Sequence, residues 1–304
     1  YYYRGHLDYD RALKEFAIAQ KGQPNNSDLL AAISYVQRRQ GKFEQALTNI
    51  QKAAELDPRS SKKAFEAGNT CRFIRNYPEA ERYYDRAISI APDWAEAYNF
   101  KVELYIQREG KTEKARKVLE EVEGKIDPAE LAASWAELDV FDGNYQAALG
   151  RLPGPNVFDN STAAYFSARA RIYGLMNQPK LKRVYYDSLR IIQEKRVAAR
   201  PQEARYHSLL GIAYAGLGRK EEAIQEGKKG VELLPVSKEA IIGPGNVSIL
   251  AKIYVMVGEF DAAIDQLEYL LSIPSEYSVP LLRINPTWAP LRNHPRFKKL
   301  VAEK

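Results

Sequence analysis

The chain has 304 residues, 45% of them hydrophobic and 28% charged, which is the composition of an ordinary globular protein. Its net charge of +6 is low for a dedicated nucleic-acid binder, whose basic residues normally cluster on one face. No apolar run approaches the roughly 20 residues that a membrane-spanning helix requires.

The first three units of the sequence share one 34-residue register. A period of this length is the signature of a solenoid, in which each unit packs only on its neighbours. We therefore interpret the chain as a repeat array rather than as two globular domains. Four series of residues keep the spacing: Ala12, Ala46 and Ala80; Ala19, Ala53 and Ala87; Pro24, Pro58 and Pro92; Tyr9, Phe43 and Tyr77.

The second unit shows how each repeat is expected to fold. Small alanines let its two helices approach closely, and Gly41 supplies the left-handed residue that ends the first of them. Pro58 cannot continue the second helix and is suited to starting the next one. Apolar residues at helical spacing mark the first helix with Leu30, Ile33 and Val36, and the second with Phe43, Ala46, Leu47, Ile50 and Ala53.

The register continues, less regularly, to an eighth unit. In unit five, the run from Pro153 to Pro155 is expected to cut the second helix short. In unit six, Lys182 replaces the alanine, and the second helix is expected to run to about Arg200. Elsewhere the alanine recurs at Ala115, Ala148, Ala223 and Ala263, and a turn glycine often lies five residues before it, at Gly41, Gly110, Gly143, Gly218 and Gly258.

This pattern resembles the tetratricopeptide repeat, which places small, aromatic, glycine, alanine and proline residues in the same order. The resemblance covers nearly the whole chain and is strongest in units two, three, seven and eight. It implies an all-α fold, an α-solenoid in which about eight helix-turn-helix units form a right-handed superhelix. We expect the solenoid to span residues 1–273 with a truncated first unit, because Tyr1 falls in the middle of a first helix. An open end of this kind exposes apolar surface, so we also expect further residues before Tyr1.

Residues 274–304 depart from the repeat and hold five of the 16 prolines. We expect a cap made of an extended segment and a short helix from about Pro295, with Trp288 and Leu291 covering the apolar end of unit eight. The tail also resembles the closing segment of bacterial signalling proteins in which such repeats follow a kinase, a nucleotide cyclase, a TolB-like segment or a winged-helix domain. The likeness lies in Leu282–Pro286, Trp288, Pro290–Arg292 and Pro295–Phe297.

Residue types that carry catalysis are few and scattered. His6, His207 and His294 are far apart in sequence, so in a solenoid they are not expected to converge on one metal. His207 and the single cysteine, Cys71, occupy packing positions. We therefore expect no catalysis, metal or cofactor in this chain. A lone cysteine forms no internal disulfide, and it favours a cytoplasmic location over the extracytoplasmic side of a membrane-anchored protein.

Partner binding is expected on the concave side, which the first helices line in the family that the chain resembles. Aromatic rings there would supply contact area, while Arg and Asn would bond backbone or carboxylate groups. The alternative is a solvated groove without a ligand. The outward positions of those helices predict a peptide-binding groove made of Tyr35, Arg38, Phe65, Asn69, Arg72, Asn99 and Glu103.

Two specific kinds of partner are disfavoured. The co-chaperone branch of the family clamps a terminal carboxylate with Lys, Asn and Arg, and neither register of this chain supplies that set. The segment Lys180–Arg200 carries seven basic residues against two acids. However, Arg183, Asp187, Arg190 and Glu194 alternate in sign at helical spacing, which favours pairing along the helix over contact with nucleic acid or anionic membrane.

The sequence thus predicts a non-catalytic protein-interaction or sensory module, a fragment of a larger bacterial regulatory protein. A free-standing scaffold or assembly factor is the alternative, and a nucleic-acid-associated solenoid is a weaker one. The sequence leaves the identity of the partner and the oligomeric state open.

Overall fold

The computed structural model describes residues 7–152, 154 and 161–302 of the chain. Within these ranges the regular structure is helical throughout, and α2 (Tyr9–Gly22) is the second helix of unit one. The hairpins of units two to eight are α3 (Ser27–Arg39) with α4 (Phe43–Leu56), α5 (Ser61–Phe73) with α6 (Tyr77–Ile90), α7 (Ala95–Glu109) with α8 (Glu113–Glu120), α9 (Pro128–Phe141) with α10 (Tyr145–Arg151), α11 (Ser161–Leu175) with α12 (Pro179–Ala199), α13 (Ala204–Leu217) with α14 (Lys220–Leu233), and α15 (Gly243–Met256) with α16 (Phe260–Ser272).

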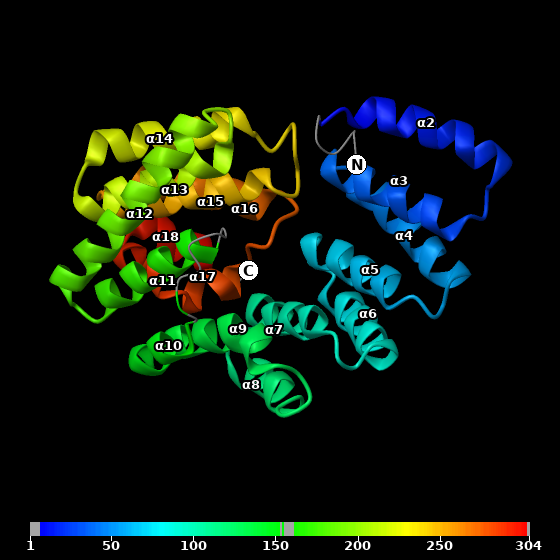
Figure 1. Cartoon of the computed structure of the whole chain (residues 1–304), viewed down its shortest axis with the longest axis horizontal. Helices are drawn as coiled ribbons and strands as arrows, with labels where there is room; N and C mark the ends of the chain where they lie inside the picture. Colours follow the sequence, from blue (N-terminus) through cyan, green and yellow to red (C-terminus); the bar gives the residue numbers. More distant parts are fainter. Residues whose placement is uncertain (1–6, 153, 155–160, 303–304) are drawn as a thin grey trace.

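The hairpins follow one another along an arc that starts at α2 and ends at α16 (Figure 1). Each hairpin packs on the next, which confirms the all-α solenoid that the 34-residue register predicts. The residues expected to begin the first helix of unit one, 1–6, lie outside the described residues.

The alanine of the second helix forms the seam of each hairpin. A methyl group at this position lets the two helix backbones approach, and any larger side chain would meet the facing helix. In every unit that keeps it, this alanine has no exposed surface: Ala12, Ala46, Ala80, Ala115, Ala148, Ala223 and Ala263 are all 0% exposed.

Replacing Ala80 by leucine is expected to lower the free energy of unfolding by about 1–3 kcal/mol, because the seam has no room for three more carbon atoms. Urea denaturation followed by circular dichroism measures the change. The exposed Ala147 of α10 offers a matched control, since Ala147→Leu adds the same atoms at the surface. Equal losses in the two variants would show that the seam is not close-packed.

A residue with a positive φ angle ends the first helix of each hairpin. Glycine takes this left-handed conformation without strain, and five hairpins use it. Their glycines are Gly41, Gly110, Gly143, Gly218 and Gly258, with φ between 63° and 83°. Units three and six place Arg75 (φ 61°) and Asn177 (φ 54°) there instead. Asparagine is the usual substitute for glycine in this conformation, whereas arginine is not.

Two units carry the irregularities that the sequence indicates. The second helix of unit five, α10, ends at Arg151 and has only seven residues. Pro153 and Pro155 themselves lie outside the described residues. In unit six, α12 extends for 21 residues to Ala199, as expected. The short α8 of unit four, eight residues long, was not expected.

The carboxy-terminal segment is more helical than its prolines suggest. It contains α17 (Val279–Ile284), the 3₁₀ helix η1 (Pro286–Leu291) and α18 (Pro295–Val301). The expected helix from Pro295 is confirmed, but the expected extended chain before it is wrong. The reason is local, because prolines stand at the first turn of each helix, where no backbone N–H is needed. Ser278 and Asn285 then cap α17 and η1 through their side-chain oxygens.

Trp288 and Leu291 of η1 are completely buried, as expected for residues that cover the end of unit eight. They join an apolar cluster with Leu267 and Leu270 of α16 and with Phe297 of α18. The last repeat therefore ends on a packed cap rather than on open apolar surface.

The two halves of the arc also meet each other. Three backbone carbonyls at the same repeat position, those of Arg39, Phe73 and Gln107, lie at the carboxyl ends of α3, α5 and α7. Helix ends leave such carbonyls without partners inside the helix. Each accepts a hydrogen bond from the second half of the chain: from the Ala240 N–H (2.8 Å), from the Ser275 N–H (3.1 Å) and from the Ser278 hydroxyl.

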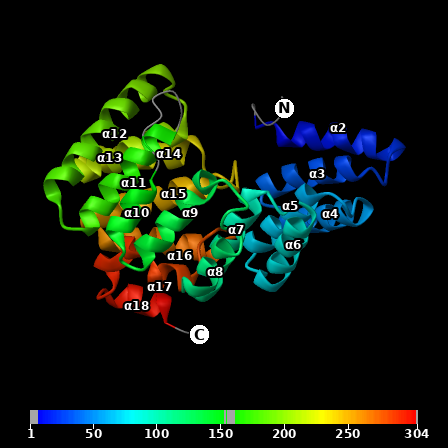
Figure 2. The same ribbon diagram turned by 60° about the horizontal axis from the view of Figure 1, so that its bottom comes forward.

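Arg75 adds the most extensive of these contacts. From its strained turn position its guanidinium donates to the carbonyls of Tyr277 (2.9 Å), Ile273 (2.9 Å) and Leu270 (3.1 Å). We call residues 273–278, which join α16 to α17, the strap. The strap and α17 lie against the α5 and α7 ends of the arc, and both views show α17 beside α7 (Figures 1 and 2).

A second contact closes the arc near its beginning. Glu239, between α14 and α15, is completely buried and accepts hydrogen bonds from the Arg39 guanidinium and the Tyr9 hydroxyl. The neighbouring Ala240 packs on Phe43 and Phe73. Units one to three are thus held to the second half of the chain by an ion pair, by hydrogen bonds to the carbonyls at helix ends and by apolar contact.

Candidate functional site

Three of the seven residues predicted for the peptide groove are buried, which corrects the expectation that they face outward. Phe65 is 3% exposed and lies among the rings of Tyr84, Trp94 and Phe100. Asn69 is 6% exposed and accepts a hydrogen bond from the Tyr84 hydroxyl at 2.7 Å. These side chains hold units three and four together and offer a ligand almost no surface.

Arg72 is the third buried residue, with 0% exposure. Its guanidinium lies 4.9 Å from the centre of the Phe100 ring. Its two terminal nitrogens contact Glu103 of α7 at 3.0 Å and Glu276 of the strap at 3.1 Å. Arg72 therefore joins the first half of the arc to the strap, a role that sequence periodicity does not reveal.

The remaining predicted residues lie at the surface of the concave side, partly engaged with neighbours. Arg38 pairs with Glu66 at 2.6 Å and lies 5.9 Å from the Tyr35 ring. Asn99 accepts a hydrogen bond from Ser134 at 2.6 Å. Glu103 is the most accessible of the set, because 48% of its side-chain surface is exposed.

Glu103 lies at a pocket of about 300 Å³ between α7, α9 and the strap. Its walls combine aliphatic and aromatic side chains with polar ones. The aliphatic and aromatic part is Val102, Ile106, Ala133, Leu138, Phe141 and Leu281, and the polar part is Glu103, Gln107, Ser134, Glu137, Glu276, Tyr277 and Asn285. The structure thus brings Glu103 together with carboxylates from two other elements.

Glu103 and Glu137, two of the carboxylates of this pocket, have different electrostatic surroundings. Partial burial raises the pKa of Glu103 to about 7, with Glu276 and Glu137 adding to the rise and Arg72 opposing it. Burial also disfavours ionisation of Glu137, but the charge of Arg171, which pairs with it, outweighs burial and lowers its pKa. Of these two carboxylates, Glu103 is therefore the less stable in its charged form.

Replacing Glu103 by glutamine is expected to change the pH dependence of stability. Folding raises the pKa of Glu103 above its ordinary value, so its favourable contribution is present at low pH and is lost as the pH rises from about 4.5 through about 7. The melting temperature of Glu103→Gln, measured relative to that of wild type, should therefore be higher at pH 8 than at pH 5. Calorimetric melts at both pH values measure this. A difference between the two proteins that does not vary with pH would contradict it.

Glu137 and Arg171, which the prediction missed, follow a signal that the sequence does contain. Asn69, Glu103, Glu137 and Arg171 are successive members of one 34-residue series, so extending the register by two units would have found them. Glu276 lies outside the repeats, and no periodic signal points to it.

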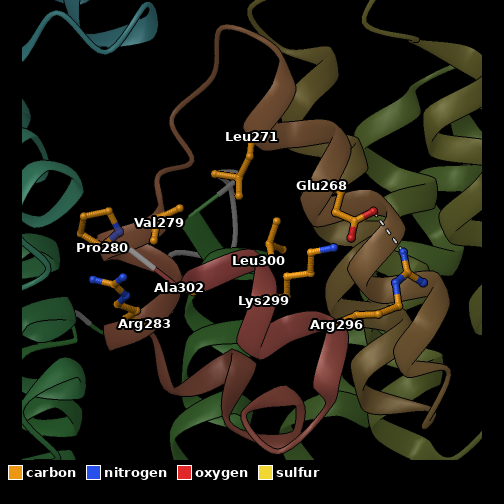
Figure 3. Close-up of a pocket in the computed structure, with 9 residues that line it drawn as sticks. All are labelled: Glu268, Leu271, Val279, Pro280, Arg283, Arg296, Lys299, Leu300 and Ala302. Atoms are coloured by element: carbon orange, nitrogen blue, oxygen red, sulfur yellow. Dashed lines mark hydrogen bonds and ion pairs between the residues drawn. The ribbon is translucent and has the colours of Figure 1, made fainter. Parts of the chain in front are cut away.

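A larger cavity, about 760 Å³, lies where the cap meets unit eight. Figure 3 shows its walls: Leu271, Val279, Pro280 and Leu300 are apolar, and Arg283, Arg296 and Lys299 are basic. The two arginines serve the cap, because Arg296 pairs with Asp261, Asp265 and Glu268, and Arg283 donates to the Val301 carbonyl. We interpret this cavity as a junction of the cap rather than as the main site.

Cys71 and His207, the cysteine and one of the histidines noted in the sequence, are buried packing residues. Cys71 is completely buried, and burial raises the pKa of its thiol to about 12, so it behaves as a small apolar side chain. His207 is buried between the Glu226 carboxylate (2.6 Å) and the Pro201 carbonyl (2.9 Å). Among the described residues, no three His, Cys, Asp or Glu side chains gather as metal ligands.

None of the described helices has the length and hydropathy needed to cross a bilayer.

Stacked helical hairpins with a shared concave side define the chain as an α-solenoid of the protein-interaction scaffold class. A family model described as "Tetratricopeptide repeat" matches residues 1–62 and 193–237. These two stretches resemble tetratricopeptide repeats, and the 34-residue register and the left-handed turns of the hairpins continue the same repeat pattern through the other units.

Two known proteins that resemble the chain are described as tetratricopeptide repeat proteins. The tetratricopeptide repeat-containing protein trd-1 of Caenorhabditis elegans is 36% identical over 80 residues, which are 26% of this chain and 10% of that protein. The chain thus matches only about a tenth of the length of this relative. The Cut9–Hcn1 hetero-tetramer of the APC/C gives a TM-score of 0.51 at 15% identity, covering 82% of this chain and 46% of the other.

A tetratricopeptide repeat protein from Parabacteroides merdae is 15% identical, with a TM-score of 0.39 and 90% of each chain covered. At 15% identity, the Cut9–Hcn1 structure shows the fold alone.

Proposed function

We propose that the chain is a non-catalytic interaction module that holds a segment of a partner protein in the concave pocket between α7, α9 and the strap. The observation that carries this is the pocket itself, which has a volume of about 300 Å³ and both apolar and charged walls. Binding sites of this kind combine apolar contact area with a few polar groups that fix orientation. Of the groove residues predicted from sequence, Glu103 would touch the partner directly. Tyr35, Arg38 and Asn99 would extend the contact along the concave side.

We further propose that the module belongs to a larger bacterial regulatory protein, whose catalytic or DNA-binding part would lie in another domain. The support is the likeness of the tail, residues 274–304, to the closing segment of such proteins. In this proposal residues 1–273 form the solenoid and the tail forms its cap. A free-standing scaffold remains the alternative, and reading the gene upstream of Tyr1 separates the two.

Contact with nucleic acid is a weaker alternative, because the basic segment of α12 pairs internally. Arg190 contacts Asp187 at 2.9 Å and Glu194 at 2.7 Å along the same helix. Nucleic-acid binding that falls steeply with salt concentration would favour this alternative over ours.

Site-specific photocrosslinking tests which face of the module binds. The photoreactive residue p-benzoylphenylalanine would replace Ala133, an exposed residue of the pocket wall, or Ala147, an exposed residue of α10. In cells that express the chain, we expect a defined crosslinked partner from position 133 and none from position 147. Crosslinks from position 147 alone, or equally from both, would contradict binding on the concave side.

A further inference from the structure

The concave pocket has an unbalanced charge. Its lining contains the carboxylates of Glu103, Glu137 and Glu276 and no lysine or arginine. Glu137 has its own partner in Arg171, and Lys252 also stabilises its charged form. Glu103 and Glu276, in contrast, share the single guanidinium of Arg72. When both are ionised, this pair carries one negative charge more than its partner compensates.

Among the described residues, Arg72 is the cation that pairs with these two carboxylates, while the nearby Arg75 guanidinium bonds to carbonyls of the strap. Glu103 faces Arg72 of α5, Tyr84 of α6 and Glu137 of α9, in addition to Glu276 of the strap. Arg72 is the only one of these that is positively charged. The two carboxylates keep about half of their side-chain surface exposed, 48% for Glu103 and 53% for Glu276, so a ligand can reach both.

Two other features of the pocket suit a long cationic side chain: apolar walls for its aliphatic stem and an unpaired acceptor for its charged end. The pocket walls next to the carboxylates are apolar, with Val102, Ile106 and Leu281. Gln107, also in the lining, is only 5% exposed, and its Oε1 has no hydrogen-bond partner among the described residues. Buried polar atoms normally have a partner, so an unpaired acceptor beside surplus negative charge fits a ligand that donates.

We propose that this pocket binds the side chain of a lysine or arginine residue on the partner segment, with its aliphatic stem on the apolar walls and its cation between Glu103 and Glu276. This inference rests on the proposed function, and it names the chemistry that the partner must present. Both side chains bury their methylene stems readily while their charged ends seek polar groups. A charged donor would also be held by charge-assisted hydrogen bonds to the two carboxylates.

The surroundings of Glu103 make this binding dependent on pH. Because its pKa is raised to about 7, Glu103 is largely protonated at pH 6 and must lose its proton to balance a cation. Lysine itself stays charged at both pH values, since its ordinary pKa is near 10.4. By linkage, a cationic ligand should bind about fivefold to tenfold more weakly at pH 6 than at pH 8.

A matched pair of peptides tests the proposal without knowledge of the natural partner. The probe is acetyl-Ala-Lys-Ala-amide, and the control is the same peptide with norleucine, which has a similar stem and no charge. We expect NMR titration at pH 8 to show at least fivefold tighter binding of the lysine peptide, with shifts in the Ala133 and Phe141 resonances. Equal affinities, or shifts confined to other parts of the chain, would overturn it.

Two variants attribute the preference to the charge of the pocket. Glu276→Gln removes the surplus charge and retains an oxygen for Arg72, so it should abolish the preference for lysine. Glu96→Gln removes an exposed acid at the start of α7, outside the pocket, and should leave the preference unchanged. An unchanged preference in Glu276→Gln would overturn the proposal. If Glu276→Gln does not fold, the wild-type comparison at pH 6 and pH 8 decides: a preference that does not weaken at pH 6 counts against it.

The peptide experiment and the crosslinking experiment test the inference and the proposed function separately. A partner that crosslinks from position 133, together with no preference for lysine over norleucine, would remove this inference and leave the proposed function standing. No crosslinking from position 133 would remove the proposed function, whatever the peptides show.

Discussion

Replacing Arg72 by methionine is expected to lower the free energy of unfolding by about 3 kcal/mol, the low end of the range for breaking a buried ion pair. The guanidinium is completely buried, and its loss leaves Glu103 and Glu276 close together without the cation between them. Methionine fills much of the volume against Phe100, so the loss is mainly electrostatic. The half-exposed carboxylates are partly rescued by water, which keeps the effect at the low end. Urea denaturation measures it.

The matched control for this prediction is Arg82→Met. Arg82 pairs with Glu79 along the surface of α6, and 61% of its side chain is exposed. Surface pairs contribute little, so this variant should stay within about 0.5 kcal/mol of wild type. If Arg72→Met were equally mild, Arg72 would not be the link between the repeats and the strap.

Replacing Arg75 by glycine is expected to lower the free energy of unfolding by at least about 2.5 kcal/mol, although glycine is the residue that most units use at this position. Glycine relieves the left-handed strain, which is worth roughly 1–2 kcal/mol. The variant loses three hydrogen bonds from a charged donor to the carbonyls of Leu270, Ile273 and Tyr277, each worth about 1.5–3 kcal/mol. The lost bonds outweigh the relieved strain.

Hydrogen exchange and limited proteolysis show where the effect falls. In Arg75→Gly the strap should exchange and be cleaved faster, while the seam of unit three stays protected. Asn177→Gly is the matched control, because Asn177 has the same left-handed conformation in unit six. It should be neutral or slightly stabilising. A stabilising Arg75→Gly would mean that the strap is held by other contacts.

Periodic features of the fold could be predicted from sequence because each depends on residues within one repeat. The alanine seam, the turn glycines and the long α12 all follow from spacing and local propensity. The structure of the cap is harder to predict, because its prolines suggest an extended segment rather than helices. Pro280, Pro286 and Pro295 instead stand in the first turn of α17, η1 and α18.

The candidate site could be predicted only in part, for a physical reason. Glu103 is predicted by the 34-residue register, and the same register, extended by two units, also points to Glu137 and Arg171. The burial of Arg72 and the presence of Glu276 depend on a contact between residues 204 positions apart. The contact between Arg72 and Glu276 forms because the arc curves back over several repeats, and the sequence of a single repeat does not determine that curvature. Arg75 was the available clue, as an arginine where the register calls for glycine.

The capped carbonyls of Arg39, Phe73 and Gln107 have a consequence for how the chain folds. An open stack of repeats can lose its terminal units one at a time, because each has a neighbour on one side only. Here units two, three and four gain a second neighbour from the far end of the sequence. Contacts over such sequence separations form late, after the intervening chain is ordered. We therefore expect the amino-terminal units to reach their full protection only after the last repeat has been synthesised, and unfolding to be more cooperative than in an open array.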